Sequence, residues 1–202
     1  MTVTLYIILA TVLVSVACFN NGELFLRLSF SAYRVARRGE WYRVLSHGLV
    51  HADWMHLFVN MFTFYSFGRY IEAVFGGLSP GAMPFLLLYF GGMAIASAYD
   101  LVKRRDDREY LSVGASGAVS AVLFAAIFLN PWDKIYLFAA IPVPGILFGA
   151  LYLVYCQYMA RRGGDRVNHN AHFYGAVYGF LFPALLEPGL AGRFLEQLLL
   201  YK

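Results

Sequence analysis

Charged residues are scarce in this chain and make up 14% of its 202 residues. Soluble globular domains have about a quarter of their residues charged, so the composition argues against a soluble protein. The net charge is only +4, and no basic stretch with interleaved aromatic residues stands in an aqueous context. A nucleic-acid partner is therefore not expected, and the positive charges are better explained as residues that flank membrane segments.

Cysteine is also rare, with two residues in the chain. Cys18 and Cys156 both lie in apolar runs. Two such cysteines form no disulfide framework, and they indicate little about the redox compartment. The sequence has no internal repeat, low-complexity segment or second soluble domain, so we expect a single membrane domain over residues 1–202.

Hydrophobic residues make up 60% of the chain and come in long blocks, which indicates a multi-pass membrane protein. No basic segment precedes the first block, so it is predicted to be a transmembrane helix rather than a signal peptide. Pro142 and Pro144 are expected to break or kink the fifth block. We predict an all-α bundle of six transmembrane helices, over residues 2–19, 54–75, 82–102, 111–129, 135–159 and 171–186.

Residues 20–46, between the first two predicted helices, mix charged residues with leucines and aromatic residues. This mixture suits a segment that lies in the membrane interface with its apolar side toward the acyl chains. An ordinary soluble loop is the alternative, and the aromatic content favours the interfacial position.

Polar side chains inside apolar helices are costly and call for an explanation. His56 and Asn60 are four residues apart and share one face of the second predicted helix. Ser116 begins the fourth helix, and His172 begins the sixth. Successive spans alternate in direction, so the starts of helices two, four and six lie on the same side of the membrane. These groups are therefore expected to meet at one depth in one leaflet.

This set is sufficient for serine hydrolysis. Ser116 would be the nucleophile, and His172 the general base and then the acid for the leaving amine. His56 and Asn60 could donate to the oxyanion, together with the backbone amides of Ser116 and Ala115, since the first N–H groups of a helix lack intrahelical partners. No carboxylate is evident that could serve as a third catalytic residue, so we predict a Ser–His dyad.

Glycines surround the serine and recur along the sixth helix. Gly114 and Gly117 leave room around the Ser116 hydroxyl, and Gly175 and Gly179 allow the sixth helix to approach the fourth. Small residues are also common in helix packing that has no catalytic role, and each polar residue has a similar structural explanation taken alone. The coincidence of all of them in one leaflet favours catalysis.

No metal or cofactor is expected. His47 and His51 are four residues apart with His56 nearby, a grouping that would suit zinc. However, the metalloprotease pattern needs glutamate directly after the first histidine, where this chain has Gly48. No carboxylate clearly completes a site, so we expect these histidines to form hydrogen bonds that tie the interfacial segment to the second helix.

Together, these residues resemble the rhomboid family of intramembrane serine proteases, with motifs in the family's order. The motifs are Tyr42-Arg43, then His47-x3-His51-x4-His56-x3-Asn60, then Gly114-Ala115-Ser116-Gly117, then Ala171-His172-x2-Gly175-x3-Gly179. The resemblance implies a six-helix core and hydrolysis of peptide bonds in or near substrate transmembrane segments. It implies that Ser116 and His172 form the dyad, and that His56, Asn60 and the Ser116 amide line the oxyanion hole. It also implies that residues 20–46 form a membrane-embedded first loop.

Two features depart from the family's pattern or add to it. The family often has a tyrosine four residues after the serine, where it stacks on the histidine, but this chain has Ser120. Phe173 or Tyr174 are the candidates to replace that tyrosine. His169 adds a second histidine near the site, and the sequence assigns no role to it.

The expected surroundings are a lipid bilayer and transmembrane protein substrates, in a prokaryotic cell (inner) membrane. Lys and Arg gather in the first, third and fifth loops, which by the positive-inside rule would place the active-site face in the cytoplasm. The resemblance implies the opposite orientation, which we prefer because the first-loop arginines can serve the fold of that loop. The sequence does not fix the substrate or the oligomeric state.

Two other functions remain open. One is a catalytically silent relative that binds transmembrane segments, against which the intact Ser116 and His172 argue. The other is a small transporter with His56, Asn60 and His172 as its polar pathway. No charged pathway runs through the predicted spans to support transport.

Overall fold

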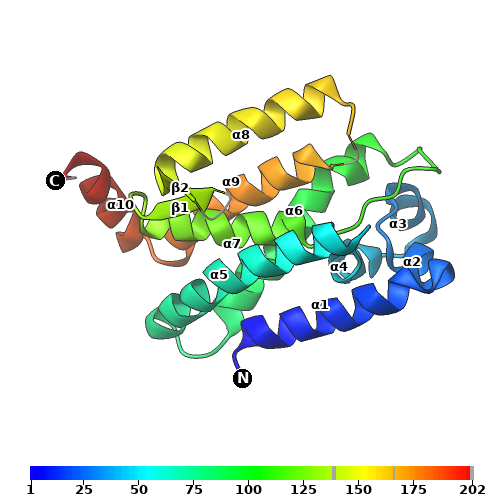
Figure 1. Cartoon of the computed structure of the whole chain (residues 1–202), viewed down its shortest axis with the longest axis horizontal. Helices are drawn as coiled ribbons and strands as arrows, with labels where there is room; N and C mark the ends of the chain where they lie inside the picture. The colour runs from blue at the N-terminus through cyan, green and yellow to red at the C-terminus, as the bar shows by residue number, and fades with distance from the viewer. Residues whose placement is uncertain (138–139, 166, 201–202) are drawn as a thin grey trace.

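The structure of the chain, a computed structural model, describes residues 1–137, 140–165 and 167–200. Within this part, long helices pack side by side with their axes roughly aligned, and α8 and α1 lie on opposite flanks (Figure 1). The long helices are α1 (Val3–Phe19), α5 (Trp54–Leu78), α6 (Met83–Lys103), α7 (Ser116–Leu129), α8 (Gly145–Arg162) and α9 (His169–Leu186). Shorter elements are α2 (Gly22–Leu28), α3 (Ala32–Arg38), α4 (Arg43–Ser46), the 3-10 helix η1 (His47–Leu49) and α10 (Gly189–Leu199).

Among the described residues, α6 is the one helix both long and apolar enough to cross a membrane on its own. Helices α1 and α7 are apolar but shorter. Helices α5 and α9 carry polar residues of the candidate site, and α8 ends in two arginines.

The predicted fifth helix was wrong over its first part. Strands β1 (Lys134–Leu137) and β2 (Ile141–Pro144) form an antiparallel hairpin, and α8 begins only at Gly145. Pro142 and Pro144 cannot donate backbone hydrogen bonds, so a helix could not continue through them. Residues 138–139 of that predicted span lie outside the described residues.

The fourth helix also begins later than predicted, at Ser116 instead of residue 111. The preceding segment is extended, and Ser112 exchanges two backbone hydrogen bonds with Phe30, at 2.9 and 3.1 Å. Gly114 then takes a φ of +112°, which a right-handed helix cannot include. Together, these features hold the serine at the very first position of α7.

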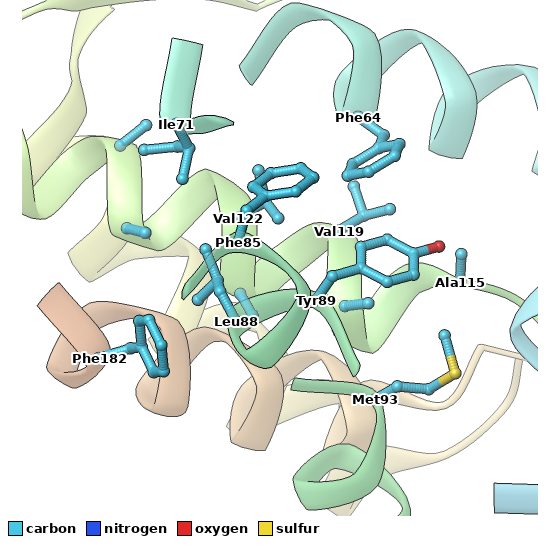
Figure 2. Packing of buried hydrophobic residues seen from close by; sticks show 14 of the residues in the cluster. Phe64, Ile71, Phe85, Leu88, Tyr89, Met93, Ala115, Val119, Val122 and Phe182 are labelled. Carbon is cyan, nitrogen blue, oxygen red and sulfur yellow. The ribbon is translucent and has the colours of Figure 1, made fainter. Parts of the chain in front are cut away.

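The hydrophobic core lies between α5, α6, α7 and α9. Figure 2 shows aromatic side chains of α5 and α6, among them Phe64 and Tyr89, facing the apolar side of α7. The rings of Phe64 and Tyr89 are 4.8 Å apart. Ala115, directly before the candidate nucleophile, belongs to this cluster and is fully buried. The core thus fixes the backbone at the start of α7.

Helix α7 is the centre of the bundle, and glycines set its distance from α9. A Cβ atom on Gly175 would overlap the Gly117 carbonyl, and one on Gly179 would overlap the Ala121 backbone. Both neighbours are backbone, which cannot rotate aside. The predicted small-residue contact between the fourth and sixth helices is therefore confirmed, and it brings the start of α9 against the start of α7.

The first loop is folded around a buried arginine. The Arg43 side chain is 1% exposed and donates hydrogen bonds to the carbonyls of Leu26 and Ser29 and to the Glu40 carboxylate. A buried cation needs such partners, so this arginine holds the loop together rather than adding to its surface charge. Part of the loop's apolar side faces the protein, since Phe30 is also buried.

Candidate active site

Ser116 is held at the start of α7 by a backbone that only glycine can form. Gly114 has a positive φ, and a Cβ atom placed on it would lie 2.6 Å from Cε1 and 2.7 Å from Nε2 of His56. The imidazole of His56 therefore packs directly against the backbone of residues 112–115, the segment before Ser116 that we call the serine loop. This contact brings the second and fourth predicted helices together at the serine, as the sequence predicted.

His172 lies in the first turn of α9, across the close contact between α7 and α9. The carbonyl of its neighbour Ala171 would be 3.6 Å from a Cβ atom on Gly117, the residue after Ser116. Within the described part of the chain, no hydrogen bond joins Ser116 to His172. Catalytic hydrogen bonds are often long in resting structures and tighten when substrate binds, so the missing bond does not argue against a Ser116–His172 pair.

An aromatic ring stacks on His172, but this ring comes from a different helix than the sequence predicted. The ring of Tyr152, on α8, stacks on His172 with centroids 6.3 Å apart and planes 11° apart. Its hydroxyl forms a 2.9 Å hydrogen bond with the Ser120 hydroxyl, one turn beyond Ser116 on α7. Serine at position 120 thus does not leave the histidine without an aromatic partner, since it bonds the ring that takes that place.

The two candidates from the sequence do not fill this role. Tyr174 stacks on Tyr99 of α6, with ring centroids 5.4 Å apart, and Phe173 meets the edge of Tyr174. Phe173 and Tyr174 follow His172 by one and two residues, so on a helix they point about 100° and 200° away from it, and neither lies over its ring. An aromatic residue on another element was required.

We expect Tyr152→Leu to lower kcat about tenfold, since an aromatic pair contributes roughly 0.5–1.5 kcal/mol beyond its area. KM should change little, because the ring positions the histidine and does not contact substrate. Tyr152→Phe keeps the ring and should retain most of the activity, whereas Tyr65→Leu, at an exposed site on α5, serves as control. Steady-state cleavage kinetics across pH measure this effect, and wild-type kcat in Tyr152→Leu would rule out a positioning role.

The predicted oxyanion donors have different surroundings. Asn60 is buried, and its amide nitrogen donates one hydrogen to the His56 carbonyl at 2.9 Å, which leaves its second hydrogen for another acceptor. The Ser116 amide is at the first helical position, where intrahelical partners are missing. The Ala115 amide donates to Nε2 of His51 at 3.4 Å, so the structure does not leave it free for an oxyanion.

His51 supports the serine loop from the opposite side. The Ser15 hydroxyl donates to the Leu49 carbonyl at 2.8 Å and also lies 3.0 Å from Nδ1 of His51. The Ser15 hydroxyl proton is donated to the Leu49 carbonyl, so in the bond between Ser15 and His51 the donor is Nδ1 of His51. Nε2 of His51 then accepts the hydrogen bond from the Ala115 amide. His51 therefore links α1 to the residue that precedes the nucleophile.

His47 supports the same loop through its backbone. Its carbonyl accepts the Gly114 amide at 3.0 Å, and its Nε2 lies 3.0 Å from the Ser97 hydroxyl on α6. The sequence predicted that these histidines tie the first loop to the second helix, and the hydrogen bonds correct that prediction. Their partners are α1, α6 and the serine loop, whereas among the described residues α5 is reached only by the ring contact between His51 and His56, whose centroids are 4.9 Å apart.

Burial of these two histidines predicts that the folded chain loses stability at acidic pH. Loss of solvation lowers the pKa of His47 to about 4 and, together with the neighbouring histidines, lowers the pKa of His51 to about 3. Below the unfolded value of about 6.5, the unfolded chain takes up protons that the folded chain does not. Stability should therefore be constant above that pH and fall by about 1.4 kcal/mol per pH unit for each histidine between about pH 6.5 and 4.

Denaturant unfolding of the detergent-solubilised chain at pH 7.5, 6 and 5 measures this slope. His51→Gln, which cannot be protonated, should reduce it. Equal stability of the wild-type chain at pH 7.5 and 5 would contradict the prediction.

Comparisons with known proteins show which family the chain resembles. The family model of the Rhomboid domain matches residues 38–188. RHOMBOID-like protein 12, mitochondrial, of Arabidopsis thaliana is 28% identical over 169 residues, which cover 76% of this chain and 48% of that protein. Rhomboid protein 1, mitochondrial, of Saccharomyces cerevisiae is 30% identical over 145 residues, 69% of this chain and 40% of that protein.

A bacterial relative covers more of the chain. Rhomboid protease GluP of Bacillus subtilis is 24% identical over 180 residues, which cover 89% of this chain and 33% of that protein. The chain thus spans less than half the length of each of these three relatives.

Proposed function

Because the chain belongs to the rhomboid family and is therefore an integral membrane protein, we propose that it is an intramembrane serine endopeptidase with a Ser116–His172 dyad. The observation that supports the proposal is the close approach of the starts of α7 and α9, which carry Ser116 and His172, together with the stacking of Tyr152 on His172. One of the relatives, GluP of Bacillus subtilis, is named a rhomboid protease.

In the proposed reaction, Ser116 Oγ attacks the carbonyl carbon of the scissile peptide bond while His172 takes its proton. The carbonyl oxygen becomes an oxyanion, for which the Ser116 amide, the second hydrogen of Asn60 and the His56 ring are the candidate donors. His172 then gives the proton to the leaving amine nitrogen. Water, activated by the same histidine, hydrolyses the acyl-enzyme and restores Ser116.

The proposed substrate is a transmembrane segment that loses its helix locally. Backbone hydrogen bonds are closed within a helix in lipid, so a peptide bond becomes accessible to a nucleophile only where the helix unwinds. Segments with glycine, proline or other small residues near the cut should therefore be preferred. A groove lined by Leu153, Tyr158 and Phe173, among others, lies between α8 and α9 and offers a place for such a segment.

The relatives come from more than one kind of membrane. The relatives include mitochondrial proteins of a plant and of yeast as well as a bacterial protease. The prediction of a prokaryotic inner membrane is therefore not supported. Membrane-protein substrates remain the proposed partners.

Reconstitution tests the proposal. The purified chain is placed in liposomes with a model transmembrane substrate that carries a glycine pair in its helix, and the products are resolved by mass spectrometry. We expect a defined internal cut that depends on the intact chain. A catalytically silent relative that only binds transmembrane segments would retain the substrate without cutting it, and that outcome would replace our proposal.

A further inference from the structure

His172 belongs to a cluster of three metal-binding side chains, and the proposed reaction does not use the other two. Cys156 on α8 and His169 and His172 on α9 each offer one ligand atom, and these atoms lie within 4.8 Å of one another. Cys156 and His169 are 1% and 5% exposed. This cluster is separate from His47, His51 and His56, the histidines that the sequence analysis considered and rejected for zinc.

His169 is arranged as metal-binding histidines usually are. Its Nε2 lies 2.9 Å from Oδ2 of Asp165, and its Nδ1 is buried and has no hydrogen-bond partner in the described structure. A carboxylate that accepts a proton from one imidazole nitrogen leaves the lone pair on the other nitrogen for a metal. A buried nitrogen without a partner is costly, and a metal ion would remove that cost.

We propose that Cys156, His169 and His172 form a binding site for Zn²⁺ or a similar soft divalent cation. One thiolate and two imidazoles are ligands that zinc prefers, and a fourth position would remain for water. Tetrahedral zinc with bonds of about 2.0–2.3 Å needs ligand atoms roughly 3.3–3.7 Å apart. The side chains therefore have to close by about 1 Å, which would require small rotations about χ1 and χ2 of Cys156 and the histidines.

Metal binding would switch off the dyad, a consequence that rests on the proposed function. On coordination the Cys156 thiol releases its proton to the solvent, and His172 gives the metal the lone pair of one nitrogen. The other nitrogen then carries the proton of the neutral ring, so His172 cannot take the proton of Ser116. Zinc would act as a reversible inhibitor that is removed by a chelator.

Cobalt binding tests the site without reference to activity. Co²⁺ is titrated into the detergent-purified full chain while the near-ultraviolet band of thiolate-to-cobalt charge transfer and the visible bands of tetrahedral cobalt are recorded. We expect one equivalent to bind, in the wild type and in Cys18→Ala, which keeps Cys156. The charge-transfer band should be lost in Cys156→Ala and Cys156→Ser, with circular dichroism to confirm that both variants fold. No band in the wild type, or a band that persists in folded Cys156→Ala, would overturn the site.

Inhibition separates the site from its consequence. In liposomes, Zn²⁺ should reduce cleavage by the wild type at least tenfold, and EDTA should restore it. The zinc concentration for half inhibition, measured against each variant's own metal-free rate, should rise at least tenfold in Cys156→Ala. If the chain binds cobalt but does not cleave the substrate, the metal site stands and the proposed function is wrong. If the chain cleaves and binds cobalt but zinc does not slow cleavage, the proposed inhibition is wrong.

Discussion

Ser116→Ala is expected to reduce cleavage of a transmembrane substrate at least a thousandfold, because removal of a catalytic serine leaves only the weak catalysis of the remaining site. Its stability should match the wild type, since the Ser116 hydroxyl makes no hydrogen bond within the described residues. Cleavage in liposomes and denaturant unfolding measure the two effects side by side.

A matched control is Ser66→Ala, which removes a hydroxyl from an exposed position on α5 that bonds only its own helix. This variant should cleave at the wild-type rate. If Ser116→Ala also retained wild-type activity, the assignment of the nucleophile would be wrong.

Gly179→Ala is expected to cause the largest loss of stability of any glycine-to-alanine change among the described residues, because its Cβ would meet backbone at the shortest distances. The new Cβ would overlap the carbonyl and Cα of Ala121, and backbone on a packed helix has no other position to take. Overpacking typically costs about 1–3 kcal/mol and more where nothing can yield, so we expect a loss of at least about 3 kcal/mol. Activity should fall too, because α9 carries His172 and would be pushed away from α7.

The matched control is Gly76→Ala, near the end of α5, where an added Cβ meets no atom within 4 Å. Alanine is the better helix former by about 1 kcal/mol, so this variant should be as stable as the wild type or slightly more stable. Denaturant unfolding in detergent compares the two. Equal stability of Gly179→Ala and Gly76→Ala would mean that α7 and α9 are not in close contact.

The helices could be predicted from apolar blocks, but their boundaries depend on residues that hydropathy does not weigh. The sixth helix was expected at residue 171, and it begins at His169 because the Asn168 side chain accepts the Ala171 amide at 3.0 Å and caps it. The fifth was expected from residue 135, although the prolines at 142 and 144 already indicated a break. Hydropathy could not indicate that the residues before the break would pair as a hairpin.

The candidate site shows a similar division between what could and could not be predicted. Placement of Ser116 and His172 at one end of the bundle followed from alternating helix direction, which needs only the order of the apolar blocks. Tyr152 could not be found this way, because its role depends on the rotation of α8 about its axis and on a hydrogen bond to Ser120. The same rotation places Cys156, one turn further along α8, beside the histidines of α9.

Labelling with a fluorophosphonate tests the central claim most directly, because such a probe forms a stable bond only with an activated serine. The chain is treated in liposomes, digested and mapped by mass spectrometry. We predict a single adduct on Ser116, present in the wild type and absent from both Ser116→Ala and His172→Ala. An adduct on another residue, or undiminished labelling of Ser116 without His172, would contradict the account of a Ser–His dyad.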